Sequence, residues 1–355
     1  MAVNRAKWSS AVVRWQREHG RHHLPWQVSR DPYRVWLSEI MLQQTQVTTV
    51  LGYYERFLAR FDTVEALAAA QPDEVLALWS GLGYYSRARN LHRCAQQVVA
   101  CYAGQFPSDP EQLMQLPGIG RSTAAAISAF CFRRRSAILD GNVKRVLARV
   151  TGFDQDLSQL RHERALWEVA QSLLPASTHM PAYTQGLMDL GATVCTRREP
   201  RCEVCPVASH CAALQQGRVH ELPLKRRAIR RSKRCSVLLL LKRAGCVWMV
   251  RRPETGVWAG LWCLPEAPVS LSGATVWDTS TWPGHGRWEQ EFEHTLTHVD
   301  WTLRPLTWTL PSRMAAAAVR KLTQQISPEA PGSWMTRDQA LSASLPAPVR
   351  KLLSD

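Results

Sequence analysis

Four cysteines near the middle of the chain constrain its fold more than any other feature. They are spaced C-x6-C-x2-C-x5-C among prolines, arginines and short polar stretches; the four are Cys195, Cys202, Cys205 and Cys211. Thiolates this close together need a cation to hold them, so the pattern predicts a metal site. The spacing leaves open both a tetrahedral zinc and a [4Fe–4S] cluster. The other cysteines are scattered, which indicates reduced thiols rather than a disulfide framework.

The charge of the chain favours a polyanionic partner. Its 44 lysines and arginines outnumber 29 aspartates and glutamates, which gives a net charge of +15 at pH 7. Ribosomal and membrane-surface proteins share such a charge, so it supports DNA binding only modestly. Met1–Ser10 has no apolar core of signal-peptide length, and the longest aliphatic run, Val237–Leu241, is too short to cross a bilayer. We therefore expect a soluble, cytoplasmic protein, associated with the nucleoid if it is bacterial.

The apolar pattern divides the 355 residues into two expected domains. Residues 1–211 are expected to form a helical domain, because apolar residues recur at helical spacing between short turns. Asp31 and Asp109 each precede a proline, a combination that predicts the start of a helix. Residues 235–355 are expected to form a smaller α/β domain. Its β-rich runs are Ser236–Leu241 and Cys246–Arg251, joined by a turn at Ala244–Gly245, and then His294–Arg304.

Residues 212–234 are interpreted as a basic linker between these domains. Its basic run is formed by Lys225, Arg226, Arg227, Arg230, Arg231, Lys233 and Arg234. A run of this kind is more often solvated chain than a contact with DNA or a protein partner, and both interpretations remain open.

A glycine-rich turn precedes an apolar helix in the segment Leu116–Thr123. Gly118 and Gly120 allow the backbone to turn tightly, and the amides that open the next helix can then face a phosphate oxygen. This is the form of a helix-hairpin-helix motif, although most short glycine-rich turns merely join helices. Asp140 follows at the start of another helix. By residue type alone, an ordinary N-cap is the favoured interpretation of Asp140.

Three longer motifs accompany the hairpin and the cysteine loop: Trp36–Val47, Gly81–Arg87 and Leu139–Val143. With them the chain resembles the helix-hairpin-helix DNA glycosylases of the endonuclease III superfamily, and most closely the MutY-type adenine DNA glycosylases, over nearly its whole length. The resemblance implies an all-α glycosylase domain with a [4Fe–4S] loop, followed by a smaller α/β MutT-like domain of Nudix fold. It favours the cluster over zinc, since zinc ribbons usually carry two C-x2-C pairs separated by a longer stretch.

The resemblance assigns two carboxylates to the chemistry. Glu39 is implied to be the general acid that protonates adenine at N7, a role suited to a desolvated carboxyl with a raised pKa. Asp140 is implied to stay ionised and to stabilise the oxocarbenium-like sugar by its charge or by covalent capture. Ser122 stands where relatives that also cut the DNA backbone carry a lysine nucleophile. We therefore expect a monofunctional glycosylase that leaves an abasic site.

Further residues are implied to contact DNA or the extruded base. Gln43, Gln44 and Tyr84 occupy motif positions that fill the space left by the base. Ser122 and Asp189 are placed around the adenine pocket. The remaining implied contacts are Thr45, Leu116, Gly118, Gly120, Asn142 and Lys144. Arginines within the cysteine loop add cationic groups, so the cluster is expected to organise a DNA-binding surface rather than to drive redox chemistry.

The C-terminal part is similar to the MutT-like module of these enzymes, most clearly over Gly256–Glu266. No metal-binding run with R-E-x-x-E-E character lies between residues 267 and 293, so we expect this domain to bind rather than to hydrolyse. The resemblance implies recognition of 8-oxoguanine by Leu296, Thr297 and His298, where relatives commonly carry Phe-Ser-His. Taken alone, His298 is more often a plain surface residue.

These features together predict a base excision repair enzyme that hydrolyses the N-glycosidic bond of adenine mispaired with 8-oxoguanine or guanine in double-stranded DNA. One alternative is an endonuclease III-type pyrimidine-lesion glycosylase, which Ser122 and the extra domain disfavour. Another is a catalytically silent mismatch-binding protein, which the presence of Glu39 and Asp140 disfavours. We expect a monomer without a membrane partner, and replication or repair proteins are candidate partners of the linker.

Overall fold

The computed structural model describes residues 5–224, 231–269 and 277–354. Contacts between Cα atoms group the chain into two compact units. Unit 1 comprises Met1–Ala69 and Asn90–Arg227, and unit 2 comprises Ala70–Arg89 and Ala228–Asp355. The segment 70–89, which the sequence assigns to the helical domain, thus belongs with the C-terminal part by its contacts. Over the described ranges, no helix is long and apolar enough to span a membrane.

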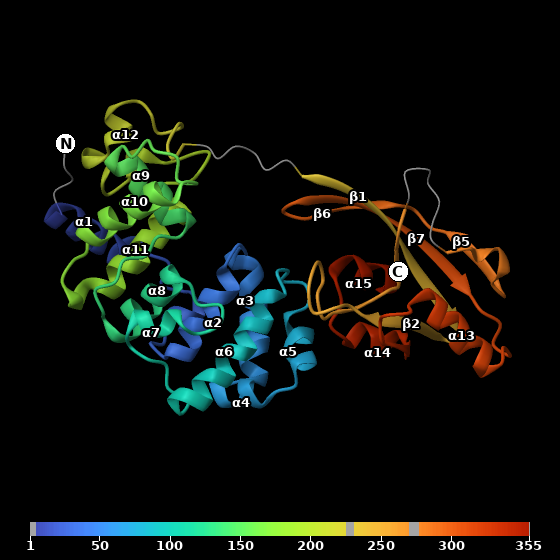
Figure 1. Cartoon of the computed structure of the whole chain (residues 1–355). Coiled ribbons are helices and arrows are strands. Elements are labelled where there is room, and N and C mark those ends of the chain that lie inside the picture. The colour runs from blue at the N-terminus through green and yellow to red at the C-terminus, as the bar shows by residue number, and fades with distance from the viewer. Residues whose placement is uncertain (1–4, 225–230, 270–276, 355) are drawn as a thin grey trace. The chain divides into compact units, whose positions relative to one another are not determined.

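Unit 1 is helical throughout the part that the structure describes (Figure 1). Its elements, with 3-10 turns marked η, are α1 (Arg5–His19), η1 (Pro25–Gln27), α2 (Pro32–Leu42), α3 (Val47–Arg60), α4 (Val64–Ala69), α6 (Ser86–Tyr102, which begins in unit 2), α7 (Pro110–Met114), α8 (Arg121–Phe132), α9 (Gly141–Thr151), α10 (Leu160–Ser172), η2 (Ser177–His179), α11 (Met180–Thr193), η3 (Cys202–Val204), η4 (Ala208–His210) and α12 (Ala212–Gln215). The predicted all-helical character is confirmed.

Local sequence signals set two of these helix starts. Asp31 caps α2, because its side chain accepts the amide hydrogen of Tyr33 at 3.0 Å and Pro32 holds the first helical position. Asp109 caps α7 in the same way, with the amide of Glu111 as donor at 3.1 Å. Both predicted helix starts are confirmed.

The core of unit 1 forms around α11, which packs against α1, α8 and α9. Within this core, Trp8 Nε1 of α1 donates to the Tyr183 hydroxyl of α11 at 2.9 Å. Ala213, Val219 and Leu222 are also buried in the same core, although they follow the last cysteine of the loop. The first part of the predicted linker therefore packs with unit 1.

The basic part of that linker is only partly described. Residues 225–230, with four of its basic side chains, lie outside the described residues. Arg231 is described, and its Nη1 lies 3.3 Å from Asp300 Oδ1. The linker boundaries and its suggested partners stay predictions.

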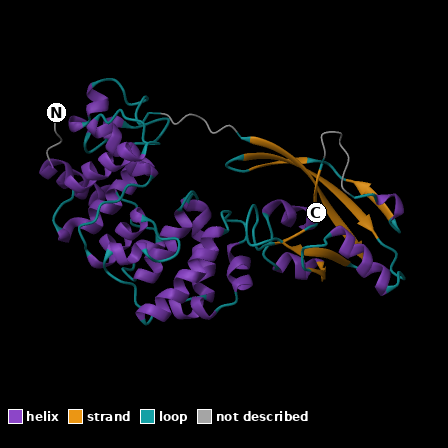
Figure 2. Cartoon of the chain, in the orientation of Figure 1, coloured by secondary structure: helices purple, strands orange, loops and turns teal. Residues whose placement is uncertain are grey.

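Unit 2 holds every strand that the structure describes (Figure 2). Its sheet has the order β3-β2-β1-β7-β5, with β4 on β1, β6 on β7 and β8 on β2. The β1–β7 pair is parallel and the others are antiparallel, so the predicted mixed α/β character is confirmed. The elements are α5 (Pro72–Trp79), β1 (Ser232–Arg243), β2 (Cys246–Arg251), β3 (Trp262–Cys263), β4 (Glu266–Pro268), η5 (Thr279–Thr281), β5 (His285–Trp288), β6 (Phe292–Thr295), β7 (Val299–Thr309), α13 (Ala316–Ile326), β8 (Gly332–Thr336), α14 (Arg337–Ser342) and α15 (Ala347–Ser354).

A core of unit 2 lies between the sheet and α13. Val237, Leu239 and Leu241 alternate along β1 and belong to one buried cluster with Leu322 and Ile326 of α13. The intervening leucines of β1 are buried as well. A strand buried on both faces is a continuous aliphatic run, which is the pattern seen in the sequence.

Two strand predictions had different outcomes. The turn at Ala244–Gly245 is confirmed, since both residues have positive φ, 46° and 79°, as a tight β-hairpin requires. The β-rich run predicted over His294–Arg304 is confirmed except for a break that the pattern does not indicate, because β6 ends at Thr295 and β7 begins at Val299. The three residues between them include none of the Gly, Pro, Asn or Asp residues that signal a turn, and the alternation continues through the reversal.

Candidate active site

Asp140 occupies the N-cap position of α9 in unit 1. Its Oδ1 accepts the amide hydrogen of Val143 at 2.7 Å. Burial raises the pKa of Asp140. Two amides and two cations act in the opposite direction; they belong to Val143, Asn142, Arg145 and Lys144. The plain N-cap is therefore present, and the same carboxylate is surrounded by groups that favour its anion.

Glu39 lies on α2 and is half-buried. Burial, and next the negative charge of Asp140, raise the pKa of Glu39 to about 8. A carboxyl with that pKa keeps its proton at neutral pH, unlike an exposed glutamate. The structure thus brings the two carboxylates selected from the sequence within electrostatic reach of each other.

A cavity of about 240 Å³ opens beside Glu39 within unit 1. Sites for drug-sized ligands measure roughly 300–1,000 Å³, so this one suits a smaller group, such as a single planar base. Its apolar lining includes Trp26, Leu42, Phe130 and Met188. Helices α1, α2, α8 and α11 and the turn η1 contribute to its walls.

Asp189 is fully buried and does not line this cavity. Its carboxylate accepts hydrogen bonds from two polar residues that do line it, Arg21 and Gln185. Its Oδ1 accepts from Arg21 Nε at 2.7 Å and from Gln185 Nε2 at 2.9 Å. Its Oδ2 accepts the Arg21 amide hydrogen at 3.0 Å. Asp189 therefore supports the cavity without lining it. Sequence reasoning missed Arg21 and Gln185, because Arg21 is 168 positions from Asp189 and no local motif marks it.

The hairpin selected from the sequence joins α7 to α8. Gly118 has a φ of +79°, and Gly120 is the N-cap of α8. Glycine has no side chain with which to cap a helix, so the first amides of α8 are left without a side-chain cap. Ser122 lies in that first turn, and its Oγ accepts the amide hydrogen of Leu139 at 3.1 Å. This bond ties the start of α8 to the residue directly before Asp140.

Gly118→Ala is expected to distort the hairpin, whereas Gly120→Ala is a matched control. A Cβ on Gly118 would lie 2.8 Å from the Cβ of Asn90, on a left-handed backbone that costs about 1–3 kcal/mol for a residue other than glycine. A Cβ on Gly120 would meet nothing within 4 Å. Thermal unfolding should therefore show a lower melting temperature for Gly118→Ala only. Equal melting of the two variants would contradict this account of the hairpin.

The residues that follow α2 form a turn with a strained backbone. Gln44 has a φ of +58°, which is uncommon for a residue other than glycine. Gln43 Nε2 donates to Thr123 Oγ1 at 3.5 Å, and Thr45 Oγ1 donates to the Gln43 carbonyl at 3.3 Å. Backbone outliers of this kind cluster at functional sites. The turn is therefore a candidate functional segment, and the Gln43 side chain is bonded to α8 within unit 1.

Three other residues selected as DNA contacts have side chains engaged inside unit 1. Lys144 Nζ pairs with Glu163 Oε1 at 2.5 Å. Asn142 Oδ1 accepts from Arg145 Nη2 at 2.8 Å. Leu116 is buried. These side chains support the hairpin and α9, so any contact with DNA here falls to the backbone or requires these pairs to open.

In unit 2, Tyr84 lies beside the turn between β6 and β7. Tyr84 is 46% exposed, and its φ is +49°. Its hydroxyl lies 3.3 Å from Thr297 Oγ1, within hydrogen-bond distance. Leu296 and His298 flank Thr297 in that turn. Thr297 and His298 are exposed. Two candidate contacts from distant motifs are thus adjacent.

The four cysteines of the predicted metal site line one cavity in unit 1. The buried Arg149 reaches that cavity, where its Nη1 donates to Cys195 Sγ at 3.3 Å and to the Thr196 carbonyl at 2.7 Å. Its Nε donates to the Leu222 carbonyl at 3.0 Å. Among the residues described, no group of three or more His, Cys, Asp or Glu side chains is arranged to hold a metal ion.

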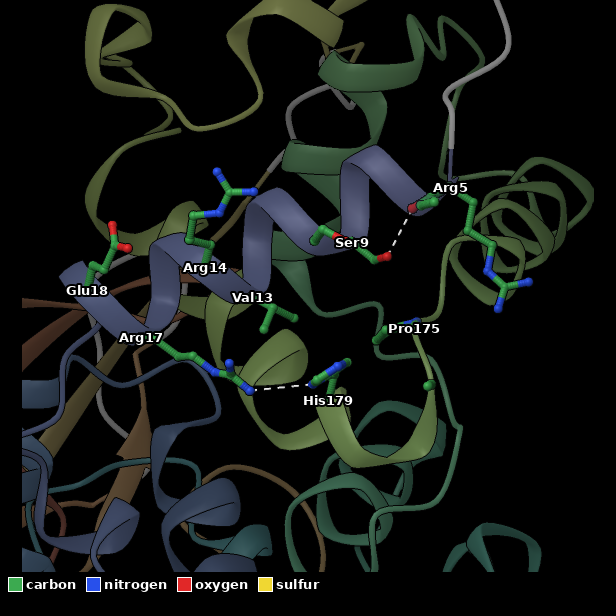
Figure 3. Close-up of a pocket in the computed structure, with 11 residues that line it drawn as sticks. Arg5, Ser9, Val13, Arg14, Arg17, Glu18, Pro175 and His179 are labelled. Carbon is green, nitrogen blue, oxygen red and sulfur yellow. Dashed lines mark hydrogen bonds between the residues drawn. The ribbon is translucent and has the colours of Figure 1, made fainter.

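A larger hollow of about 920 Å³ lies elsewhere in unit 1, between α1 and the segment before α11 (Figure 3). Arg5, Arg14, Arg17 and His179 border it, with Glu18 as its acidic residue. None of the residues selected from the sequence lines this hollow. It is therefore separate from the candidate active site.

Family models match both parts of the chain. Residues 37–172 match the HhH-GPD superfamily base excision DNA repair protein, and residues 236–355 match the NUDIX domain. Both parts of the expected fold class are thereby confirmed.

Individual relatives extend the match. An adenine DNA glycosylase of Buchnera aphidicola subsp. Baizongia pistaciae is 33% identical over 348 residues, which cover 97% of this chain and 95% of the relative. The adenine DNA glycosylase of Homo sapiens is 32% identical over 407 residues, with 96% of this chain and 72% of the relative covered. Among solved structures, a thermostable thymine-DNA glycosylase is similar with a TM-score of 0.54 at 28% identity, over 60% of this chain and 97% of that chain.

Proposed function

Since the chain belongs to the adenine DNA glycosylase family and is a DNA N-glycosylase, we propose that its substrate is adenine mispaired with 8-oxoguanine or guanine in double-stranded DNA. One observation carries the proposal. Glu39, with its raised pKa, lies on the wall of a base-sized cavity and within electrostatic reach of Asp140. Cleavage of a glycosidic bond requires two such carboxyl groups in different protonation states.

The chemistry follows from those protonation states. The neutral carboxyl of Glu39 donates its proton to N7 of the adenine, which makes the base a better leaving group. Positive charge then develops on the sugar as the N-glycosidic bond breaks. The anion of Asp140 stabilises this oxocarbenium-like cation by ion pairing or by adding to it, and water completes the hydrolysis. The products are free adenine and an abasic site.

The polar edge of the cavity supports a purine as its occupant. Gln185 donates through Nε2 to Asp189, so its side-chain oxygen is the group left to accept from the exocyclic amino group of adenine. Arg21, fixed by the same carboxylate, adds donors for ring nitrogens. Trp26 and Phe130 provide apolar ring surface for the base.

Adenine reaches this cavity only by leaving the helix. The uncapped amides at the start of α8 suit a phosphate oxygen, which would hold the strand during extrusion. Gln43, Gln44 and Tyr84 enter the space that the base leaves. The left-handed backbones of Gln44 and Tyr84 support this role, because such strain persists where function requires a side chain in a fixed direction.

Ser122 limits the reaction to base removal. Strand cleavage by a Schiff base requires an amine beside the sugar, and this position carries a hydroxyl that accepts from the Leu139 amide. The reaction therefore ends at the abasic site, and strand breaks form only after treatment with alkali. An endonuclease III-type reaction would need an amine nucleophile at this position, and Ser122 does not provide one.

The turn of Leu296, Thr297 and His298 recognises 8-oxoguanine opposite the adenine. Thr297 and His298 are exposed and provide a hydroxyl and an imidazole as hydrogen-bonding groups. The sequence from 267 to 293 lacks the acidic run of a Nudix hydrolase, and its residues 270–276 lie outside the described part. Unit 2 therefore binds the lesion without hydrolysing a nucleotide.

The four cysteines hold a [4Fe–4S] cluster. Four cysteine thiolates are the ligand set that such a cluster would need, and all four line one cavity. When bound, the cluster would supply structural order to the arginine-bearing loop, and the hydrolytic chemistry rests on Glu39 and Asp140. Protein purified without oxygen is expected to be brown and to contain iron. A colourless protein that contains zinc would contradict this assignment.

An assay on defined duplexes tests the function. Labelled strands with adenine opposite 8-oxoguanine, guanine or thymine are incubated with the protein, as is thymine glycol opposite adenine. Alkali-labile sites are expected for the first two duplexes only. Strong strand scission without alkali, or removal of thymine glycol, would overturn the proposal.

A further inference from the structure

Residues 80–86, which we call the Tyr84 turn, have an unusual backbone. Gly81, Gly83 and Tyr84 all have positive φ, at 103°, 72° and 49°. For the tyrosine, this conformation costs about 1–3 kcal/mol and persists only where the surroundings hold it. Contacts around the turn therefore hold Tyr84 in this conformation.

Part of the support comes from the residues next to the turn. Trp79 Nε1 donates to the Gly83 carbonyl at 3.1 Å. Arg87 Nη2 donates to the carbonyls of Leu82 and Gly83, each at 3.3 Å. The Arg87 guanidinium also lies 5.4 Å from the centre of the Tyr84 ring. These contacts close the turn but do not fix its direction.

Besides the contact of the Tyr84 hydroxyl with Thr297 Oγ1, further support comes from the loop between α14 and α15 in unit 2. The Leu345 carbonyl accepts from Ser80 Oγ at 3.0 Å and from the Tyr85 hydroxyl at 2.9 Å. The Tyr85 hydroxyl in turn accepts the amide hydrogen of Gly81 at 3.3 Å. One buried carbonyl of the C-terminal part thus anchors both sides of the Tyr84 turn.

Arg350 of α15 joins the end of α14 and the residue after it to Ser80 of the Tyr84 turn. Its Nη1 donates to the Leu341 carbonyl at 2.7 Å, and its Nη2 donates to the Ala343 carbonyl at 3.1 Å. The same Nη2 donates to Ser80 Oγ at 3.1 Å. The planar guanidinium is suited to bridging several carbonyls in this way, and a lysine ammonium is not.

We propose that Arg350 is a positioning residue for Tyr84, and that the C-terminal part of the chain therefore acts on the opening of the base pair as well as on recognition of the opposite base. The inference rests on the proposed function in one respect, namely that Tyr84 enters the duplex. Arg350 touches neither the base nor the sugar. It acts through the Leu345 loop and Ser80 on the direction of the tyrosine.

The test uses the full chain with Arg350→Met, which keeps an unbranched stem and removes the donors. Lys351→Met is the matched control, because Lys351 is exposed on the same helix and loses the same charge. Tyr85→Phe is a second variant, which removes only the hydroxyl that joins Gly81 to Leu345. Base opening is read from the fluorescence of 2-aminopurine next to the target adenine, and base release from single-turnover rates.

On adenine opposite 8-oxoguanine, Arg350→Met should lower both base opening and the rate of base release by about tenfold. A tenfold change corresponds to about 1.4 kcal/mol, which lies within the free energy of about 1–3 kcal/mol that a strained backbone residue stores. Tyr85→Phe should act in the same direction. On a duplex in which adenine faces an abasic analogue, the loss should be below about twofold, because an unpaired base needs less help to leave. Opening and release equal to those of Lys351→Met, or equal losses on both duplexes, would overturn the inference. A wild-type protein that opens but does not cleave would refute the proposed function alone.

Discussion

Glu39→Gln is expected to lower the single-turnover rate of adenine release by about 10²–10⁴-fold, which is the contribution of a positioned general acid. Glutamine keeps the size of the side chain but has no acidic proton to give to N7 of the base. The affinity for DNA with adenine opposite 8-oxoguanine should change little, because the cavity and the hairpin stay intact. Rates and equilibrium binding measured on the same preparation separate these two effects.

The pH dependence of the wild-type rate supplies a second signature of Glu39. Only the protonated carboxyl donates, and its pKa is raised to about 8, so kcat/KM should fall as pH rises through about 8. In Glu39→Gln this alkaline decline should be absent from the residual rate. A wild-type profile that stays flat across this range would refute the role of Glu39 as the acid.

The same raised pKa means that Glu39→Gln, although it lowers the rate, should not lower the stability of the folded chain at about pH 8. Between the ordinary pKa of a glutamate and about 8, the folded chain binds more protons at Glu39 than the unfolded chain does, so stability falls as pH rises through that window. The variant lacks this loss and should melt no lower than the wild type at about pH 8. Glu55→Gln, on an exposed position of α3, is the matched control and should change neither rate nor melting.

Local signals in the sequence predicted where helices begin better than they predicted which residues come together in the folded chain. Asp31 and Asp109 were correctly identified as helix starts, because a capping side chain and a following proline act within one turn. The reversal between Thr295 and Val299 was missed, because a tight turn built from ordinary residues carries no such local signal. Helix starts and turns can therefore be predicted from the sequence where they use characteristic residues, such as a capping aspartate followed by proline.

The cavity depends on contacts that no local pattern contains. Glu39 and Asp140 were selected through motifs, but the burial that raises the pKa of Glu39 arises from helices far apart in the chain. Arg21 and Gln185 could not be found from spacing, since both are fixed by the buried Asp189. Equally, the grouping of residues 70–89 with the C-terminal part follows from tertiary contacts alone.

Asp140→Asn and Asp140→Ala are expected to separate the two roles of this side chain. Asparagine caps a helix about as well as aspartate, so Asp140→Asn should keep the bond to the Val143 amide and the stability of α9. Alanine loses that cap and should lower the free energy of unfolding by about 1 kcal/mol. Both variants lack the anion, so both should lose about 10²–10³-fold in the rate of adenine release.

Denaturant unfolding and single-turnover kinetics on the two Asp140 variants make this comparison. Asp109→Asn is the control, because it removes one charge from another N-cap of unit 1 and should alter neither stability nor rate. An Asp140→Asn protein with normal turnover would show that Asp140 is only a cap. A rate lost in proportion to stability, in Asp140→Ala alone, would lead to the same conclusion. Loss of rate in both variants at different stabilities is the result that requires a negative charge beside the sugar, because α9 is intact in one variant and weakened in the other.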